Sequence, residues 1–188
     1  MIIVTFNYRT NIFGFPGAPG IVQNLGLRDH RLAIEWIRDN IVNFGGDRRR
    51  ITFFGQSAGG VAADWWSYAY ESDPIVSGLI SQSGNAFSFP LNRLDVTIQN
   101  WYNVSASLGC GASGNTLACM RQQNWSAIEA ASAKVKPSSG GSPLRTIPAF
   151  YPMIDDDVVF SDYENRSRTG QFAKIVRLAP LVYLRVSN

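Results

Sequence analysis

The stretch "ITFFGQSAGG", residues 51–60, decides the fold. Bulky apolar and β-branched residues lead into Gly55, and Ser57 then stands between small residues. This pattern predicts a strand over 51–54 that turns sharply into a helix over 58–70, with Ser57 at the corner. The backbone of a serine on such a turn is strained, so the residues two before and two after it must be small.

A serine at this corner favours a nucleophile. Its Oγ would project above the edge of the sheet, and the N–H of Ala58 could bind the oxyanion of a tetrahedral intermediate. The five-residue pattern is weak by itself, but the strand before it and the helix after it make it specific. A packing serine is the alternative. Ser83, in "SQSGN", lacks a glycine two residues earlier and is interpreted as the residue that ends a strand.

The surrounding pattern alternates strands and helices. Continuous apolar and β-branched residues over 2–8 predict a strand buried on both faces, and glycines and prolines over 11–26 predict a loop. Apolar spacing over 28–42 predicts an amphipathic helix, and 76–81 predicts a further strand. This order indicates a parallel α/β sheet with crossover helices. The later part reads as helices and loops, with helices expected over 93–108, 119–122 and 125–133 and a flexible loop over 136–143.

Composition excludes several classes of function. The 188 residues carry a net charge of +3, and the basic run Arg48–Arg50 is interpreted as a solvated loop, so no nucleic-acid partner is expected. No apolar stretch approaches the ~20 residues of a transmembrane segment. With two cysteines and one histidine, His30, we expect no metal site, and no cofactor is indicated.

Four stretches occur in order at close spacing: "NYRTNIFGFP", "NLGLRDHRLAIEWIRDNIVNFGGD", "ITFFGQSAGG" and "LISQSGNAF". Together they resemble the carboxylesterase type B family, which includes cholinesterases, carboxylesterases and fungal lipases. The resemblance is strong over 1–86 and weak to about 174. It implies a partial α/β-hydrolase domain over 1–188, with core strands and the nucleophile turn in 1–86 and a helical and loop-rich segment in 87–188. Residues 175–188 match the family poorly, and we expect this end to be aberrant.

The resemblance also implies a chemistry. The family cleaves carboxylic esters through a Ser-Glu-His triad, so Ser57 would be the nucleophile and Ala58 one oxyanion donor, acting on a small-molecule or lipid ester. Phe87 and Phe89 fall where the family lines its acyl pocket, and ordinary core packing is the alternative. Catalytically incompetent relatives act as binding modules, but these usually lose the serine that is present here.

Other parts of the family's machinery have no counterpart. The glycine-rich oxyanion loop, the acid and the catalytic histidine are missing, so we expect a truncated chain with negligible turnover or a non-functional fragment. His30 precedes Ser57, against the family's triad order, and is predicted to be a helix-surface or capping residue. The run Asp155–Asp157 falls ahead of a strand in the family and not at the acid.

Cys110 and Cys119 lie where the family has a small disulfide loop, and two free thiols are the alternative. Sequons at Asn103, Asn124 and Asn165 add candidate glycosylation sites. Together these features favour a secreted protein whose signal peptide is absent from this chain. The oligomeric state stays open.

Overall fold

The computed structural model describes residues 1–136 and 148–178, which form two compact units. The first comprises Met1–Thr5, Arg31–Phe89 and the residues from Asp162 onward, and the second comprises Phe6–His30 and Pro90–Ser161. In the described part of the chain, no helix is long and apolar enough to cross a bilayer.

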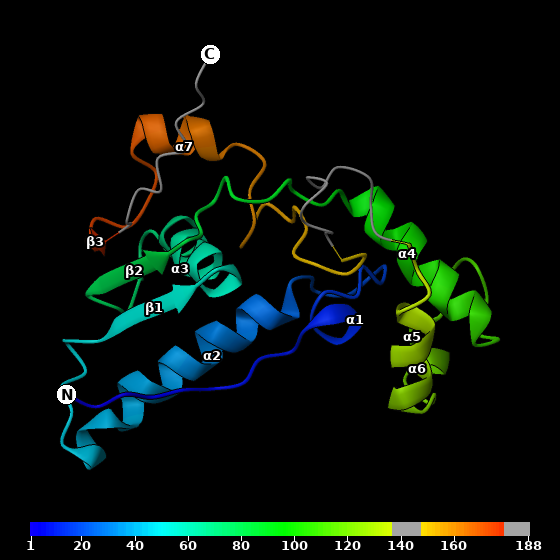
Figure 1. The fold of residues 1–188 in the computed structure, drawn as a ribbon, viewed down its shortest axis with the longest axis horizontal. Helices are drawn as coiled ribbons and strands as arrows, with labels where there is room; N and C mark the ends of the chain where they lie inside the picture. The colour runs from blue at the N-terminus through cyan, green and yellow to red at the C-terminus, as the bar shows by residue number, and fades with distance from the viewer. Residues whose placement is uncertain (137–147, 179–188) are drawn as a thin grey trace. The chain divides into compact units, whose positions relative to one another are not determined.

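The first unit contains a parallel three-stranded sheet. Strands β1 (Thr52–Gln56), β2 (Gly78–Gln82) and β3 (Val176–Leu178) lie side by side in the order β1-β2-β3. Thr52 pairs with Gly78, and Gly78 pairs with Val176. Helix α3 (Ala58–Ala69) connects β1 to β2 and packs against both (Figure 1). The predicted strand–helix–strand unit and the α/β fold class are therefore confirmed.

An apolar cluster holds this unit together. Its buried members come from α2, α3 and the region of β2: Ile34, Ala63, Trp66, Val76 and Leu79. The indole of Trp66 donates a hydrogen bond of 2.8 Å to the carbonyl of Pro74, so its N–H is satisfied inside the cluster. Trp65 is buried too, so both of these adjacent tryptophans belong to the core.

The strand predicted over residues 2–8 is wrong. Ile2, Ile3 and Val4 are 44%, 65% and 40% exposed, and this segment belongs to no strand in the described ranges. A strand buried on both faces needs a hydrogen-bonded neighbour and a covering layer on each side. In the described residues, the strands 52–56, 78–82 and 176–178 pair with one another and form a three-stranded sheet that does not include this segment.

The predicted amphipathic helix exists, but its boundaries and its buried face differ. Helix α2 spans Leu25–Asn40, and the 3-10 helix η1 (Ile41–Phe44) follows it and ends at Gly45, whose φ is 79°. The buried apolar residues include Ile34, whereas Leu32 and Trp36, which contribute to the apolar spacing over 28–42, are 66% and 53% exposed. The apolar spacing alone could not decide which of two adjacent apolar rows faces the core.

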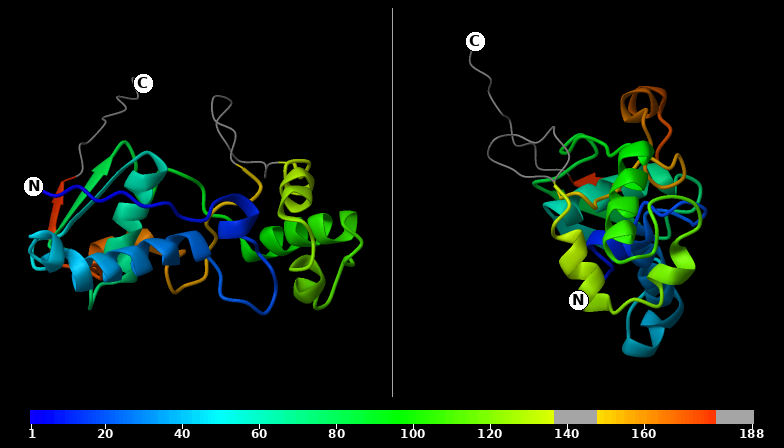
Figure 2. Two further views of the ribbon diagram at one scale, coloured as in Figure 1. Left: turned by 90° about the horizontal axis from the view of Figure 1, so that it is seen from below. Right: turned by 90° about the vertical axis from the view of Figure 1, so that its right-hand side faces the viewer.

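The second unit is mainly helical. It contains α1 (Asn11–Gly14), α4 (Leu94–Ser107), α5 (Leu117–Met120) and α6 (Trp125–Ser132). Helix α6 packs against both α4 and α1, and Figure 2 shows α4 to α6 from two further directions. The helices expected after residue 92 are confirmed to within two residues, whereas α1 and the start of α2 replace part of the predicted loop over 11–26.

The segment after Asp155 is not a strand. Val158 and Val159 are buried, yet the described residues 148–161 form no extended strand beyond a single bridge between Asn92 and Met153. The Oδ1 of Asp155 instead accepts hydrogen bonds from the N–H groups of Asp157, Val158 and Val159. Of the loop expected over 136–143, residues 137–143 lie outside the described residues.

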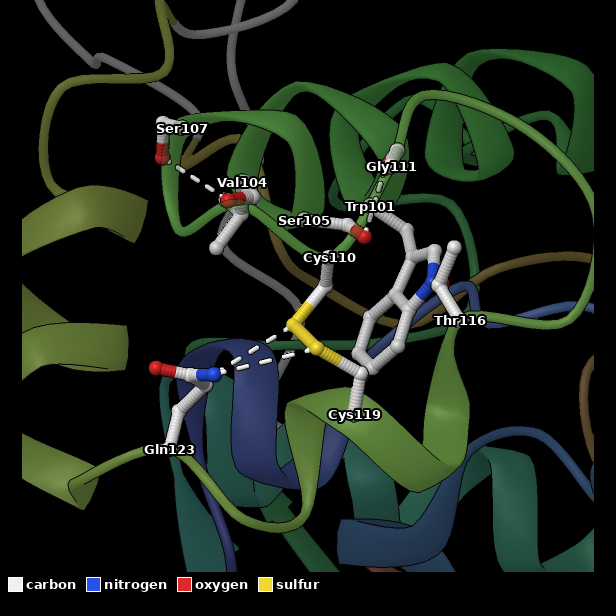
Figure 3. Close-up of a disulfide and its surroundings, with 9 residues drawn as sticks. All are labelled: Trp101, Val104, Ser105, Ser107, Cys110, Gly111, Thr116, Cys119 and Gln123. Carbon is white, nitrogen blue, oxygen red and sulfur yellow. Dashed lines mark hydrogen bonds between the residues drawn. A yellow bond between two sulfur atoms is a disulfide. The ribbon is translucent and has the colours of Figure 1, made fainter.

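A disulfide closes the loop between α4 and α5. Cys110 and Cys119 are bonded, and the Nε2 of Gln123 lies 3.4 Å from the Cys110 sulfur (Figure 3). Beside it, the indole of Trp101 donates to the hydroxyl of Thr116 at 2.8 Å. The disulfide implied by the resemblance is therefore present, and the alternative of two free thiols is wrong.

Candidate active site

Ser57 occupies the sharp turn between β1 and α3. Its φ and ψ are 55° and −117°, a conformation that L-residues rarely adopt and that costs on the order of 1–3 kcal/mol. Although Ser57 is the N-cap of α3, its hydroxyl makes no capping hydrogen bond. At an N-cap, the serine hydroxyl would ordinarily accept a hydrogen bond from a backbone N–H of the first helical turn. The Ser57 hydroxyl is thus left available for another partner.

The start of α3 presents backbone donors beside this hydroxyl. Ala58 is exposed and stands in the first turn, where N–H groups have no partner within a helix. The positive end of the helix dipole adds to the attraction for an anion. An oxyanion formed on a substrate attacked by Ser57 could therefore be bound here, as the sequence predicts for Ala58.

Three glycines allow the turn to close. A Cβ on Gly55 would lie 2.3 Å from the carbonyl carbon of Gly59, and one on Gly60 would lie 2.8 Å from the Gln82 carbonyl oxygen. A Cβ on Gly84 would lie 2.3 Å from the carbonyl oxygen of Ser57. A Cβ on Gly59, by contrast, meets nothing within 4 Å. The expectation that both flanking positions must be small is right for Gly55 but not for Gly59.

The end of β2 packs against the backbone of Ser57. The Ser57 N–H donates to the carbonyl of Gln82 at 2.8 Å. Ser83 follows with a φ of 53°, but a turn and not a helix comes after it. Ser83 therefore lacks the helix N-terminus that accompanies Ser57, in keeping with its interpretation as the residue that ends a strand.

The segment after Gly84 is a compact turn. The hydroxyl of Ser88 accepts a hydrogen bond from the N–H of Asn85, and the Asn85 side-chain oxygen accepts one from the N–H of Phe87. Phe87 is 62% exposed, and its ring centroid lies 6.5 Å from that of Tyr163. Phe89 is half-buried. An acyl-pocket role for these two phenylalanines stays a prediction.

Sequence reasoning missed Asp64. This carboxylate on α3 is 7% exposed, and its Oδ2 accepts a hydrogen bond of 2.8 Å from the N–H of Ala86. Its Oδ1 pairs with the guanidinium of Arg177 on β3. A lone acidic residue in the otherwise apolar run "GVAADWW" was the available signal, since a buried charge requires partners.

Aromatic rings cluster around Tyr163 in the same unit as Asp64. Tyr163, in α7 (Tyr163–Thr169), stacks on Trp65 at 6.3 Å and contacts Tyr68 edge-on at 4.9 Å. The Tyr68 hydroxyl is 2.7 Å from the Ser167 hydroxyl. Phe87 thus lies at the exposed edge of a ring cluster within the first unit.

His30 is not on the helix surface, and that prediction is wrong. It is 4% exposed in the second unit, and the rings of Tyr8 and Phe6 meet it edge-on at 4.3 and 5.6 Å. Burial lowers the pKa of His30 to about 4, although the nearby carboxylate of Asp29 opposes the shift. At neutral pH the imidazole is therefore an uncharged packing group.

The run Asp155–Asp157 serves local structure. Asp155 closes its own turn, and the guanidinium of Arg28 bridges to Asp157 within the second unit. These contacts account for Asp155 and Asp157 without a catalytic role.

A serine at positive φ between a parallel strand and a crossover helix defines a protein of the α/β-hydrolase class. The Carboxylesterase family profile matches residues 1–178, and the chain belongs to that family. The matched residues include β3. The resemblance found in the sequence extended only to about residue 174 and did not include this strand. The rest of the segment expected to be aberrant, residues 179–188, lies outside the described residues.

The chain is similar to two fungal enzymes. It is 38% identical over 177 residues to a chlorogenic acid esterase of Aspergillus niger, covering 93% of this chain and 33% of the relative. It is 37% identical over 190 residues to secreted lipase 5 of Gibberella zeae, covering 96% and 35%. The chain thus spans about a third of the length of these relatives.

Further similarity extends outside fungal esterases and lipases. Neuroligin-2 of Mus musculus is 33% identical over 177 residues, covering 92% of this chain and 20% of the relative.

The crystal structure of Aspergillus niger EstA superposes with a TM-score of 0.76 at 27% identity, covering 92% of this chain and 34% of that one.

Proposed function

We propose that this chain carries the nucleophile of a carboxylic ester hydrolase, and that Ser57 is that nucleophile. The observation that carries the proposal is the conformation of Ser57, with φ at 55° and its hydroxyl unused as a helix cap. A strained backbone conformation persists only where the surrounding structure enforces it, and such conformations are most common at functional sites. Membership of the carboxylesterase family supports the reaction class.

The proposed mechanism has two steps. Ser57 Oγ attacks the ester carbonyl carbon, the resulting oxyanion accepts a hydrogen bond from the N–H of Ala58, and the alcohol leaves as the acyl-enzyme forms. Water then attacks the acyl-enzyme, and the carboxylic acid departs from Ser57. A general base must take the Ser57 proton and pass it to the oxygen of the leaving alcohol in the first step, then take a proton from water and return it to Ser57 Oγ in the second.

His30 does not fit the role of base. Its ring is packed edge-on against two aromatic rings, and its lowered pKa makes it a poor proton acceptor at neutral pH. We therefore propose that the histidine and acid of the triad are residues outside the 188 of this sequence. The isolated chain should then turn over esters slowly, since loss of triad partners costs roughly 10⁴-fold or more in rate.

The substrate is proposed to be a small-molecule or lipid ester with an apolar acyl group. Exposed Phe87, which packs against the buried ring of Tyr163, offers an apolar surface in the unit that contains Ser57. A secreted location is proposed from the disulfide and from the similarity to a secreted fungal lipase.

Covalent labelling tests the proposal. A fluorophosphonate probe should label the complete protein, and Ser57→Ala should abolish both labelling and hydrolysis of a p-nitrophenyl ester. Ser83→Ala is the matched control and should retain both. If Ser57→Ala still reacts, or if the probe labels Ser83 instead, the assignment is wrong.

A second candidate is a binding module without catalysis, which the resemblance to the family also allows. The presence of Ser57 at a nucleophile turn argues against it. Absence of labelling in a folded complete protein would favour this second function.

A further inference from the structure

Asp64 connects three elements of the first unit. It lies on α3, accepts a hydrogen bond from Ala86 in the turn after β2, and pairs with Arg177 on β3. The carboxylate is 7% exposed, and Ala86 is 3% exposed. A buried charge is tolerated where it is paired and hydrogen-bonded, and both conditions are met here.

The other hydrogen bonds given for the turn that Asp64 holds join residues of the turn itself. Asn85 and Ser88 hydrogen-bond to each other, and Phe87 donates its N–H to the Asn85 side chain. The N–H of Ala86 points out of this turn, to Asp64. The hydrogen bond to Asp64 therefore fixes where the turn lies relative to α3.

Gly84, directly before this turn, contacts the candidate nucleophile, and the turn itself presents an apolar ring. Gly84 packs so closely against Ser57 that a Cβ on it would lie 2.3 Å from the Ser57 carbonyl oxygen. Phe87 follows Ala86 directly and is 62% exposed beside Tyr163. A shift of Ala86 would therefore move both the backing of Ser57 and the ring of Phe87.

We propose that Asp64 is a positioning residue, which holds the turn Asn85–Ser88 against α3 and so sets the place of Phe87 relative to Ser57. The proposal rests on the proposed function of Ser57 and deepens it. Asp64 does not touch the substrate. It acts through the Ala86 N–H, and its consequence is a preference for the length of the acyl group that Phe87 contacts.

The test uses the complete protein with Asp64→Ala, Asp64→Asn and the control Asp73→Asn. Asp73 is an exposed carboxylate that pairs with Arg31 in the same unit, so its loss removes a charge without touching the turn. Asp64→Asn keeps an oxygen that can accept from Ala86, whereas Asp64→Ala removes it. The readouts are amide exchange at Ala86, fluorophosphonate labelling rate at Ser57, and kcat/KM for p-nitrophenyl butyrate against octanoate.

We expect Asp64→Ala to raise exchange at Ala86 and to slow labelling, each on the order of tenfold, because one charged hydrogen bond is lost. The butyrate-to-octanoate ratio should change as well. Asp64→Asn should restore part of each effect, and Asp73→Asn should match the wild type. A merely structural role would lower thermal stability but leave the ratio unchanged.

Two failures can be told apart. If the wild type is labelled and Asp64→Ala keeps both its labelling rate and its acyl preference, the positioning role is wrong and the function of Ser57 stands. If the wild type is not labelled although Ala86 is protected from exchange, the proposed function fails, and Asp64 is then a structural contact only.

Discussion

The backbones of Gly55 and Gly59 touch: a Cβ on Gly55 would lie 2.3 Å from the carbonyl carbon of Gly59. The reverse is not true, since a Cβ on Gly59 points into open space. The two glycines of the G-x-S-x-G pattern therefore have different physical reasons. Gly55 permits the strand to approach the helix, whereas Gly59 could carry a side chain.

Gly55→Ala and Gly59→Ala should consequently have different effects on stability. Gly55→Ala forces the backbone at Gly59 to move and should destabilise the protein by about 1–3 kcal/mol, the usual cost of overpacking. Gly59→Ala should be neutral or stabilising by up to about 1 kcal/mol, because alanine favours a helix over glycine. Urea denaturation measures both. Equal losses in the two variants would contradict the asymmetry.

Local patterns were enough to predict the turn at Ser57, because strand, small residues and helix are encoded within residues 51–70. Contacts between distant residues were not readable in this way. The partners of Asp64 are 22 and 113 residues away, and the rings that bury His30 belong to a different segment. The apolar residues 2–8 predicted a strand because residues of these types are common in strands. Whether they form one depends on the neighbours that would bury them, and these cannot be read from the sequence.

The disulfide should stabilise the second unit. Replacing both Cys110 and Cys119 by serine should lower the free energy of unfolding by about 2–3 kcal/mol, since the bond closes a loop of this length in the unfolded chain. Urea denaturation with and without a reductant measures the effect. Reductant should lower the stability of the wild type and leave the double variant unchanged. A wild type indifferent to reductant, although its disulfide is shown to be reduced, would contradict the prediction.

His30 should make stability depend on pH. Its pKa is lowered to about 4 in the folded protein, against about 6.5 in an unfolded chain. The folded protein favours the neutral form of His30. The contribution of this preference to the free energy of unfolding is fully present above pH 6.5 and is lost as the pH falls towards 4, by up to about 3 kcal/mol. His30→Leu should show a shallower loss over this window. The NMR resonance that disappears in His30→Leu reports the pKa directly, and a midpoint near 6.5 would refute the argument.

Asn124 has two separable roles. Its Oδ1 caps α6 by accepting from the N–H and hydroxyl of Ser126 at 2.9 and 2.7 Å, and its Nδ2 is the atom that N-glycosylation would modify. Asn124→Ala should cost about 1 kcal/mol through loss of the cap, whereas Asn124→Asp should keep the cap. If the protein is secreted as proposed and Asn124 is glycosylated as its sequon predicts, both variants should lose the same mass of glycan. Mass spectrometry and urea denaturation separate the roles. An unchanged mass in both variants would exclude Asn124 as a glycosylation site, and an equal loss of stability would exclude the cap.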